Sequence, residues 1–232
     1  MTMSVEVASS STTGSPGVPG EPGATMADVA YAAIRDKLIM LTIKPGEAVV
    51  ESALSAELGV GRTPVREALK RLEYERLVIS HARRGTFATS IDVADLGDIS
   101  EIRQRLEPLA AAKAATAATA TQRQVLLGMA DRTEKFEAAP PSQHDLIKWD
   151  AEVHRTVYRL AANPVLEDAL IRYNNLATRI FWLFMDRLPP LADHVGTHTA
   201  LLRAIAAGDA EDAAAIARAH VTEFDDAVRA VI

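Results

Sequence analysis

Residues 61–72 read GRTPVREALKRL, and this stretch constrains the fold more than any other part of the chain. Thr63 followed by Pro64 is typical of a helix start, because the threonine hydroxyl can accept a hydrogen bond from a free N–H and proline has no N–H to leave unpaired. The apolar residues that follow recur at the spacing of one helical face. They are Val65, Ala68, Leu69 and Leu72. We therefore expect a helix that packs this face into a core.

The other side of this helix carries three cations. Arg62, Arg66 and Lys70 are spaced four residues apart, so their side chains project from one face. A short helix with an apolar back and a cationic front fits the DNA major groove, where arginine can pair with guanine and the remaining cations meet phosphates. Periodicity alone leaves open an ordinary solvent-exposed face.

The segment after this helix favours DNA binding. Val78-Ile79 and Thr86-Phe87 are short β-type runs on either side of a basic tip. The tip contains Arg83, Arg84 and Gly85. Glycine permits the positive φ that a tight hairpin requires. A helix followed by a basic β-hairpin predicts a winged helix-turn-helix.

Residues 45–89 closely resemble the DNA-binding domain of the GntR family of bacterial transcription regulators: PGEAVVESALSAELGVGRTPVREALKRLEYERLVISHARRGTFAT. Gly61 departs from the family pattern, which usually has Ser or Thr there. The resemblance implies a homodimer on double-stranded DNA, with two recognition helices in successive major grooves of an inverted-repeat operator. Residues expected to contact bases or backbone are Arg62, Thr63, Arg66, Lys70, Arg83, Arg84 and Gly85.

Composition is compatible with this prediction. A chain of 232 residues with 48% hydrophobic content can bury a core, most plausibly as two domains. There is no cysteine, which excludes disulfides and thiolate metal sites and fits a reducing cytoplasm. No apolar run approaches the roughly 18–20 residues of a membrane span. The net charge is −6, but residues 26–90 hold ten Lys/Arg against eight Asp/Glu. We therefore expect a mildly basic N-terminal domain followed by an acidic C-terminal domain.

We expect three parts along a mainly α chain. Residues 1–25 have almost no charge or large apolar groups and are predicted to be a disordered tail. Residues 26–90 are the winged helix-turn-helix, in which Ser52 caps a short helix and Gly59 ends it. Residues 91–232 are an all-α six-helix bundle, with an alanine-rich segment that provides a close-packing face. The expected helices of the bundle are 92–118, 121–138, 142–162, 164–187, 190–207 and 209–231.

Four potential metal ligands lie on three of these helices. Asp150 and His154 are four residues apart and share a face, while His198 and His220 lie on the fifth and sixth helices. Bundles build metal sites from such inward-pointing ligands. Three imidazoles and one carboxylate suit Zn²⁺ best, with Ni²⁺ or Mn²⁺ possible. Spacing leaves open a hydrogen-bonded surface pair and structural histidines, and His194 has no partner at a useful spacing.

Two segments around these residues, WDAEVHRTVYRLAANP and HTALLRAIAAGDAEDAAAIARAHV, resemble the signature blocks of the FCD ligand-binding domain. This domain is the C-terminal partner in the FadR branch of GntR regulators, and six helices indicate its VanR-like subgroup. The resemblance implies that the aspartate and three histidines bind a divalent metal. In this sequence they are Asp150, His154, His198 and His220.

Further polar residues are candidates for holding an effector. Arg103 matches an arginine that, in relatives, reaches toward a bound carboxylate, and a guanidinium beside a metal can hold a small organic acid. The alternative is a salt bridge from Arg103 to Glu107. Arg172, Asn175 and Arg179 lie on one helical stripe that could line the same cavity or face solvent.

Two functional classes follow. The first is a ligand-responsive transcription regulator, preferably a repressor, whose C-terminal domain senses a small organic acid at the metal. The second is a metal-dependent hydrolase that uses the Asp/His₃ site to activate water. No general base lies beside the ligand motif, so we expect that the chain is not an enzyme and has no catalytic residues. A purely structural metal is a third reading.

Overall fold

Helix α1 (Met26–Ile39) opens the described part of the computed structural model, residues 24–232. Thr25 caps this helix: its hydroxyl accepts from the N–H of Asp28, and the Asp28 carboxylate accepts from the N–H of Thr25 at 3.0 Å. The tail predicted over residues 1–25 therefore ends before Thr25. The rest of that prediction lies outside the described residues.

Helices α2 (Glu51–Leu58) and α3 (Arg62–Tyr74) form the helix-turn-helix pair, and Gly59 ends α2 at φ 65° as predicted. The apolar face predicted for residues 65–72 is buried against α1. Both helices start earlier than predicted. The residue before α2 is Val50 and not Ser52, and the residue before α3 is Gly61, which places Thr63 second in the helix. Pro64 still lies in the first turn, where its missing N–H costs no helical hydrogen bond.

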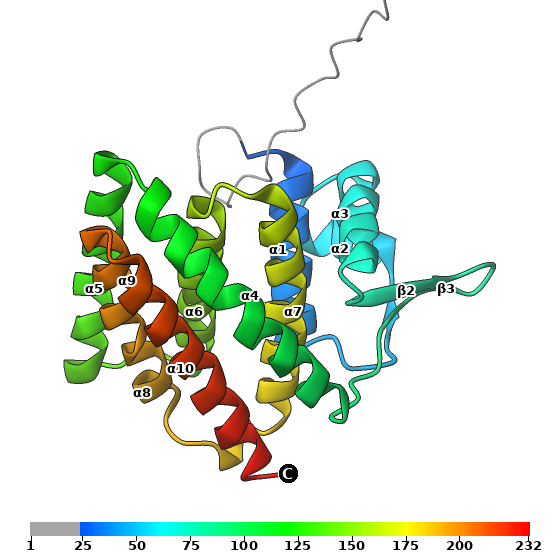
Figure 1. The fold of residues 1–232 in the computed structure, drawn as a ribbon. Coiled ribbons are helices and arrows are strands. Elements are labelled where there is room, and N and C mark those ends of the chain that lie inside the picture. The colour runs from blue at the N-terminus through cyan, green and yellow to red at the C-terminus, as the bar shows by residue number, and fades with distance from the viewer. Residues whose placement is uncertain (1–23) are drawn as a thin grey trace, which may run out of the picture.

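Three short antiparallel strands complete the N-terminal part and form the wing (Figure 1). They are β1 (Ala48–Val49), β2 (Val78–His81) and β3 (Gly85–Ala88). Strand β3 lies between the other two and pairs Ile79 with Phe87. Gly85 has φ 98°, which confirms the glycine-dependent hairpin tip.

The C-terminal part is a helical bundle, as predicted, but residues 91–232 contain seven α-helices rather than six. The predicted fifth helix divides at Thr197, whose hydroxyl donates to the carbonyl of His194 at 2.7 Å and competes with the helical hydrogen bonds. A short 3₁₀ turn (Met185–Arg187) likewise ends the predicted fourth helix early. The helices are α4 (Asp95–Ala117), α5 (Ala120–Ala138), α6 (Gln143–Leu160), α7 (Pro164–Leu183), α8 (Leu191–Gly196), α9 (His198–Ala207) and α10 (Ala210–Arg229). Within residues 24–232, no helix is both long and apolar enough to cross a membrane.

The alanine-rich segment lies in α4, which runs alongside α10 (Figure 1). Its inward positions are fully buried, which confirms the predicted close-packing face. They are Ala110, Ala111, Ala114 and Ala115. Small side chains let α4 and α10 approach each other closely. Protein interiors are close-packed, so such a contact leaves no space for added methylene groups.

We therefore expect Ala114→Leu to lower the free energy of unfolding by about 1–3 kcal/mol through overpacking. Urea denaturation measures this change. Ala117→Leu is the matched control, because Ala117 lies on the same helix and is exposed. Equal stability of the two variants would contradict the close packing of α4.

Candidate metal centre and DNA-binding face

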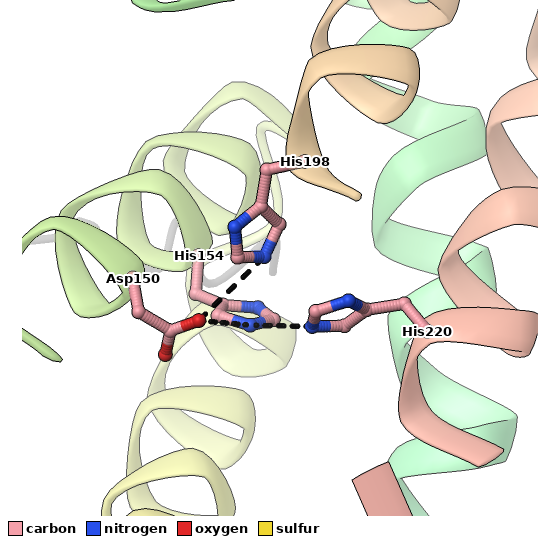
Figure 2. Close-up of side chains that lie close together, drawn as sticks. All are labelled: Asp150, His154, His198 and His220. Carbon is pink, nitrogen blue, oxygen red and sulfur yellow. Dashed lines mark hydrogen bonds and ion pairs between the residues drawn. The ribbon is translucent and has the colours of Figure 1, made fainter. Parts of the chain in front are cut away.

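The four predicted metal ligands converge in the bundle (Figure 2). Asp150 and His154 come from α6, His198 is the first residue of α9, and His220 comes from α10. All four side chains are buried, and one ligand atom from each lies within 4.8 Å of the others. Helices far apart in sequence thus bring three imidazoles and one carboxylate to a common centre.

The distances within this cluster suit a shared ion. Asp150 Oδ1 lies 3.8 Å from His154 Nε2 and 3.7 Å from His198 Nε2, and the Nε2 atoms of His154 and His220 are 3.3 Å apart. Donors that each lie about 2.0–2.2 Å from one ion are themselves separated by roughly 3–4 Å. The cluster therefore needs little movement to bind a metal.

Two atoms at the centre are buried without a hydrogen-bond partner among the described residues: Asp150 Oδ1 and His198 Nε2. Buried polar atoms nearly always have a hydrogen-bond partner, so these two atoms without one require an explanation. Burial also lowers the pKa of His198 and of His220 well below the ordinary value, which leaves both rings neutral. These two neutral imidazoles and the Asp150 carboxylate, each with unpaired electron pairs, are ligand forms that a divalent ion takes, whereas the pKa of His154 is raised by Glu107 and Asp150 despite burial. The residues present fit such an ion.

Neighbouring groups orient two of the rings. His154 Nδ1 lies 3.2 Å from Glu107 Oε2 and 3.1 Å from the Tyr158 hydroxyl, and His220 Nδ1 lies 2.8 Å from the Thr197 hydroxyl. Contacts at Nδ1 direct Nε2 toward the centre, as is usual for metal-binding histidines. Sequence reasoning missed Glu107 and Thr197 in this role, because no spacing relates α4 to α6 or residue 197 to residue 220.

His194 was excluded on sequence grounds, and the structure corrects that exclusion. Its Nε2 lies 3.8 Å from Asp150 Oδ1, and its ring stacks on that of His220 with 4.2 Å between centroids. Burial lowers the pKa of His194 to about 4. The separate helix α8 carries this residue to the cluster, and the prediction of one continuous helix over 190–207 concealed it.

Arg103 is buried beside the cluster and forms the alternative predicted for it, an ion pair with Glu107 at 2.7 Å. The pair is internal and not on the surface. Burial by itself raises the pKa of Glu107, but Arg103 and His154 outweigh this effect and lower it to about 2. Glu107 thus stays ionised between the Arg103 guanidinium and His154, one of the four candidate ligands.

Removing this carboxylate leaves Arg103 buried without its charge partner. We expect Glu107→Ala to lower the free energy of unfolding by about 3–5 kcal/mol. Urea denaturation followed by circular dichroism measures the loss. Glu101→Ala is the control, because Glu101 lies on the same helix and is exposed. A cost for Glu107→Ala as small as that of the control would show that the buried pair contributes little.

Arg172, Asn175 and Arg179 share a stripe of α7, as expected, but the structure does not bring them to the metal cluster. Asn175 donates to Glu75 Oε2 at 2.8 Å. Arg179 donates to the carbonyls of Leu38 and Thr89 and to the Thr89 hydroxyl. The stripe faces the N-terminal part of the molecule because α7 packs against α1.

The predicted DNA-contacting residues are exposed on α3 and at the hairpin tip, which projects from the molecule next to α3 (Figure 1). Arg66 is paired with Glu51 of α2, with Nη2 2.9 Å from Oε2 and Nε 3.3 Å from Oε1. Sequence reasoning did not identify Glu51. The remaining cations of the face extend into solvent around this pair. They are Arg62, Lys70, Arg83 and Arg84.

Comparison with known proteins gives two family matches. Residues 26–88 match the family described as bacterial regulatory proteins, gntR family, and residues 98–223 match the FCD domain. The Nta operon transcriptional regulator of Aminobacter aminovorans is 30% identical over 190 residues, which cover 82% of this chain and 88% of that protein. An uncharacterized HTH-type transcriptional regulator of Streptomyces ambofaciens is 41% identical over 64 residues, 28% of this chain and only 27% of its own length.

A solved structure agrees in fold. McbR/YncC of E. coli superposes with a TM-score of 0.71 at 20% identity, covering 89% of this chain and 96% of that one. The agreement spans both the winged helix-turn-helix and the helical bundle.

Proposed function

We propose that this chain, which belongs to the GntR family of bacterial regulatory proteins and carries an FCD domain, is a repressor that responds to a small organic acid. As a member of that family it is a DNA-binding transcriptional regulator with a ligand-binding domain. The hydrolase alternative is therefore wrong, and the expectation that the chain is not an enzyme is confirmed. We place its action in the cytoplasm, where chromosomal DNA lies.

The observation that carries the sensing proposal is the pair of buried, unpartnered atoms at the centre of the Asp/His₃ cluster, Asp150 Oδ1 and His198 Nε2. Zinc is the preferred occupant because it takes nitrogen and oxygen ligands of this number, with nickel and manganese as alternatives. A carboxylate could bind such an ion only at a further position, by expanding its coordination beyond these four protein ligands to five or six. Arg103 engages Glu107 through Nε, so its two terminal nitrogens are not used in that bond and could hold the acid.

On DNA, we assign residues 26–90 to reading the operator and residues 91–232 to sensing and dimerisation. Two copies would place their α3 helices in successive major grooves of an inverted repeat. Arg62 and Arg66 would read bases, while Thr63 and Lys70 fix the position on the backbone. The wing, with Arg83, Arg84 and Gly85, would contact an adjacent phosphate or minor groove.

Helix α7 offers a route between the two parts. Arg179 and Asn175 tie it to Leu38, Thr89 and Glu75 of the N-terminal part, and α6, which carries Asp150 and His154, also packs against it. An acid could change DNA affinity only if it binds one arrangement of these parts more tightly than another. Such coupling typically amounts to a 5- to 150-fold change in affinity.

The test begins with selection of bound sequences from random DNA. Operator affinity of the zinc-loaded protein is then measured with and without succinate and other small di- and monocarboxylates. We expect an inverted repeat and at least a fivefold loss of affinity with an effective acid. An unchanged affinity with every acid would contradict the sensing proposal, and failure to enrich any sequence would contradict the operator proposal.

A further inference from the structure

A cavity lies at the junction of the N-terminal part and the bundle, separate from the Asp/His₃ cluster. It has a volume of about 410 Å³, within the range typical of small-molecule sites. The segment that follows α3 contributes Arg76, and the segment that follows β3 contributes Thr89 and Ser90. Helices α4 and α7 supply the opposite wall, and none of the four candidate metal ligands lines the cavity.

Arg172 on this wall is unlike its neighbour Arg179, two turns along the same face of α7. All three nitrogens of the Arg179 guanidinium donate hydrogen bonds to Leu38 or Thr89. The Nε of Arg172 is buried and has no hydrogen-bond partner within the part of the chain that the structure describes. Unpaired buried donors are rare in native proteins. A ligand with an anionic acceptor would pair this nitrogen.

The remaining wall residues define what else such a ligand must carry. Arg76 also lines the cavity, and a second arginine reinforces the preference for a carboxylate. Asp95 and Asp98 also line the cavity. Their negative charges disfavour a ligand with two anionic groups and favour a ligand that carries a cationic group in addition to its carboxylate. Ile99 and Leu176 add an apolar surface.

We propose that this cavity binds a second effector, an α-amino acid with an apolar side chain. Its carboxylate would meet Arg172 and Arg76, its ammonium would meet Asp95 and Asp98, and its side chain would lie against Ile99. Since the walls come from both parts of the molecule, an occupant stabilises their present arrangement. Arg76 follows Glu75, the residue that caps the C-terminal end of α3, so the occupant would lie next to the end of the helix proposed to read DNA.

The test uses L-leucine as the probe, in isothermal titration calorimetry with the full-length protein. Titrations run on zinc-loaded and on chelator-treated samples, because a site in this cavity does not need the metal. Arg172→Ala and Arg76→Ala are the test variants, and circular dichroism verifies their fold. Arg105→Ala is the matched control, since Arg105 lies on α4 and is exposed outside this cavity.

We expect L-leucine to bind both samples equally, at least tenfold more weakly to each test variant, and unchanged to Arg105→Ala. Isoamylamine and 4-methylpentanoate, which lack the carboxylate or the ammonium, should bind at least tenfold more weakly than leucine. No binding of leucine to the wild type, or binding that both test variants leave unchanged, would overturn the proposal. Binding confined to the zinc-loaded sample would also overturn it. None of these outcomes depends on the proposed metal-dependent acid response.

Discussion

Replacing Arg66 with alanine is expected to abolish selective operator binding while leaving the fold intact. The side chain is exposed, so its loss removes no core packing. A bidentate arginine–guanine pair contributes about 1–3 kcal/mol of discrimination, which is roughly 5- to 150-fold for each half-site. Gel-shift titrations with the selected operator and with a scrambled duplex measure the ratio of the two affinities. Retained selectivity in this variant would contradict the assignment of α3 as the reading helix.

The ion pair between Arg66 and Glu51 does not prevent this role. Solvent and salt weaken an exposed pair of this kind, so a bidentate contact to a base can displace Glu51. Arg105→Ala is the control, because it removes an exposed arginine of the bundle. Its affinity for operator should equal that of the wild type, which separates loss of a reading residue from loss of general positive charge.

Binding of zinc to the Asp/His₃ cluster is expected to raise the stability of the protein. A ligand present at about one hundred times its dissociation constant adds about 2.7 kcal/mol, and for a chain of this size that is a rise in Tm of roughly 5–10 °C. We therefore expect zinc to raise the Tm of chelator-treated wild type by this amount. His198→Ala should lose the response, because it removes one of the four ligands from the cluster.

His144→Ala is the control for this experiment. His144 is exposed on α6, the helix that carries two of the ligands, and lies outside the cluster. It should keep the full rise in Tm with zinc. A wild-type Tm that is the same with and without zinc would contradict the proposal of a metal site at these residues.

Local patterns in the sequence predicted the N-terminal part well. The apolar spacing from Val65 to Leu72 gave the buried face of α3, and Gly59 gave the end of α2. The start of α3 was misplaced because Thr63-Pro64 resembles a cap, whereas the first turn tolerates proline at its third position as well. Cap chemistry fixes a helix start to within a residue or two and no better.

The Asp/His₃ cluster was only partly predictable. The four-residue spacing of Asp150 and His154 places them on one face, but no spacing indicates which face of α9 or α10 will meet it. Only the resemblance to the FCD domain assigned His198 and His220 to the same predicted site as Asp150 and His154. His194 was missed because its position depends on the break at Thr197, whose hydroxyl bonds the His194 carbonyl and also contacts His220 Nδ1.

The prediction that the α7 stripe lines the effector cavity was wrong for a related reason. Periodicity correctly grouped Arg172, Asn175 and Arg179, but a helical period identifies a face without identifying what packs against it. In the structure that partner is the N-terminal part, so these residues lie at the junction and not at the metal cluster.

Calorimetric titration of succinate, or of the acid found most effective on operator binding, into zinc-loaded and chelator-treated protein tests the central claim most directly. The claim is that the cluster of Asp150, His154, His198 and His220 holds an ion on which recognition of an acid depends. We expect saturable binding to the zinc-loaded protein and none to the chelator-treated protein. Equal affinity in the two samples would contradict the claim and leave the metal with a structural role.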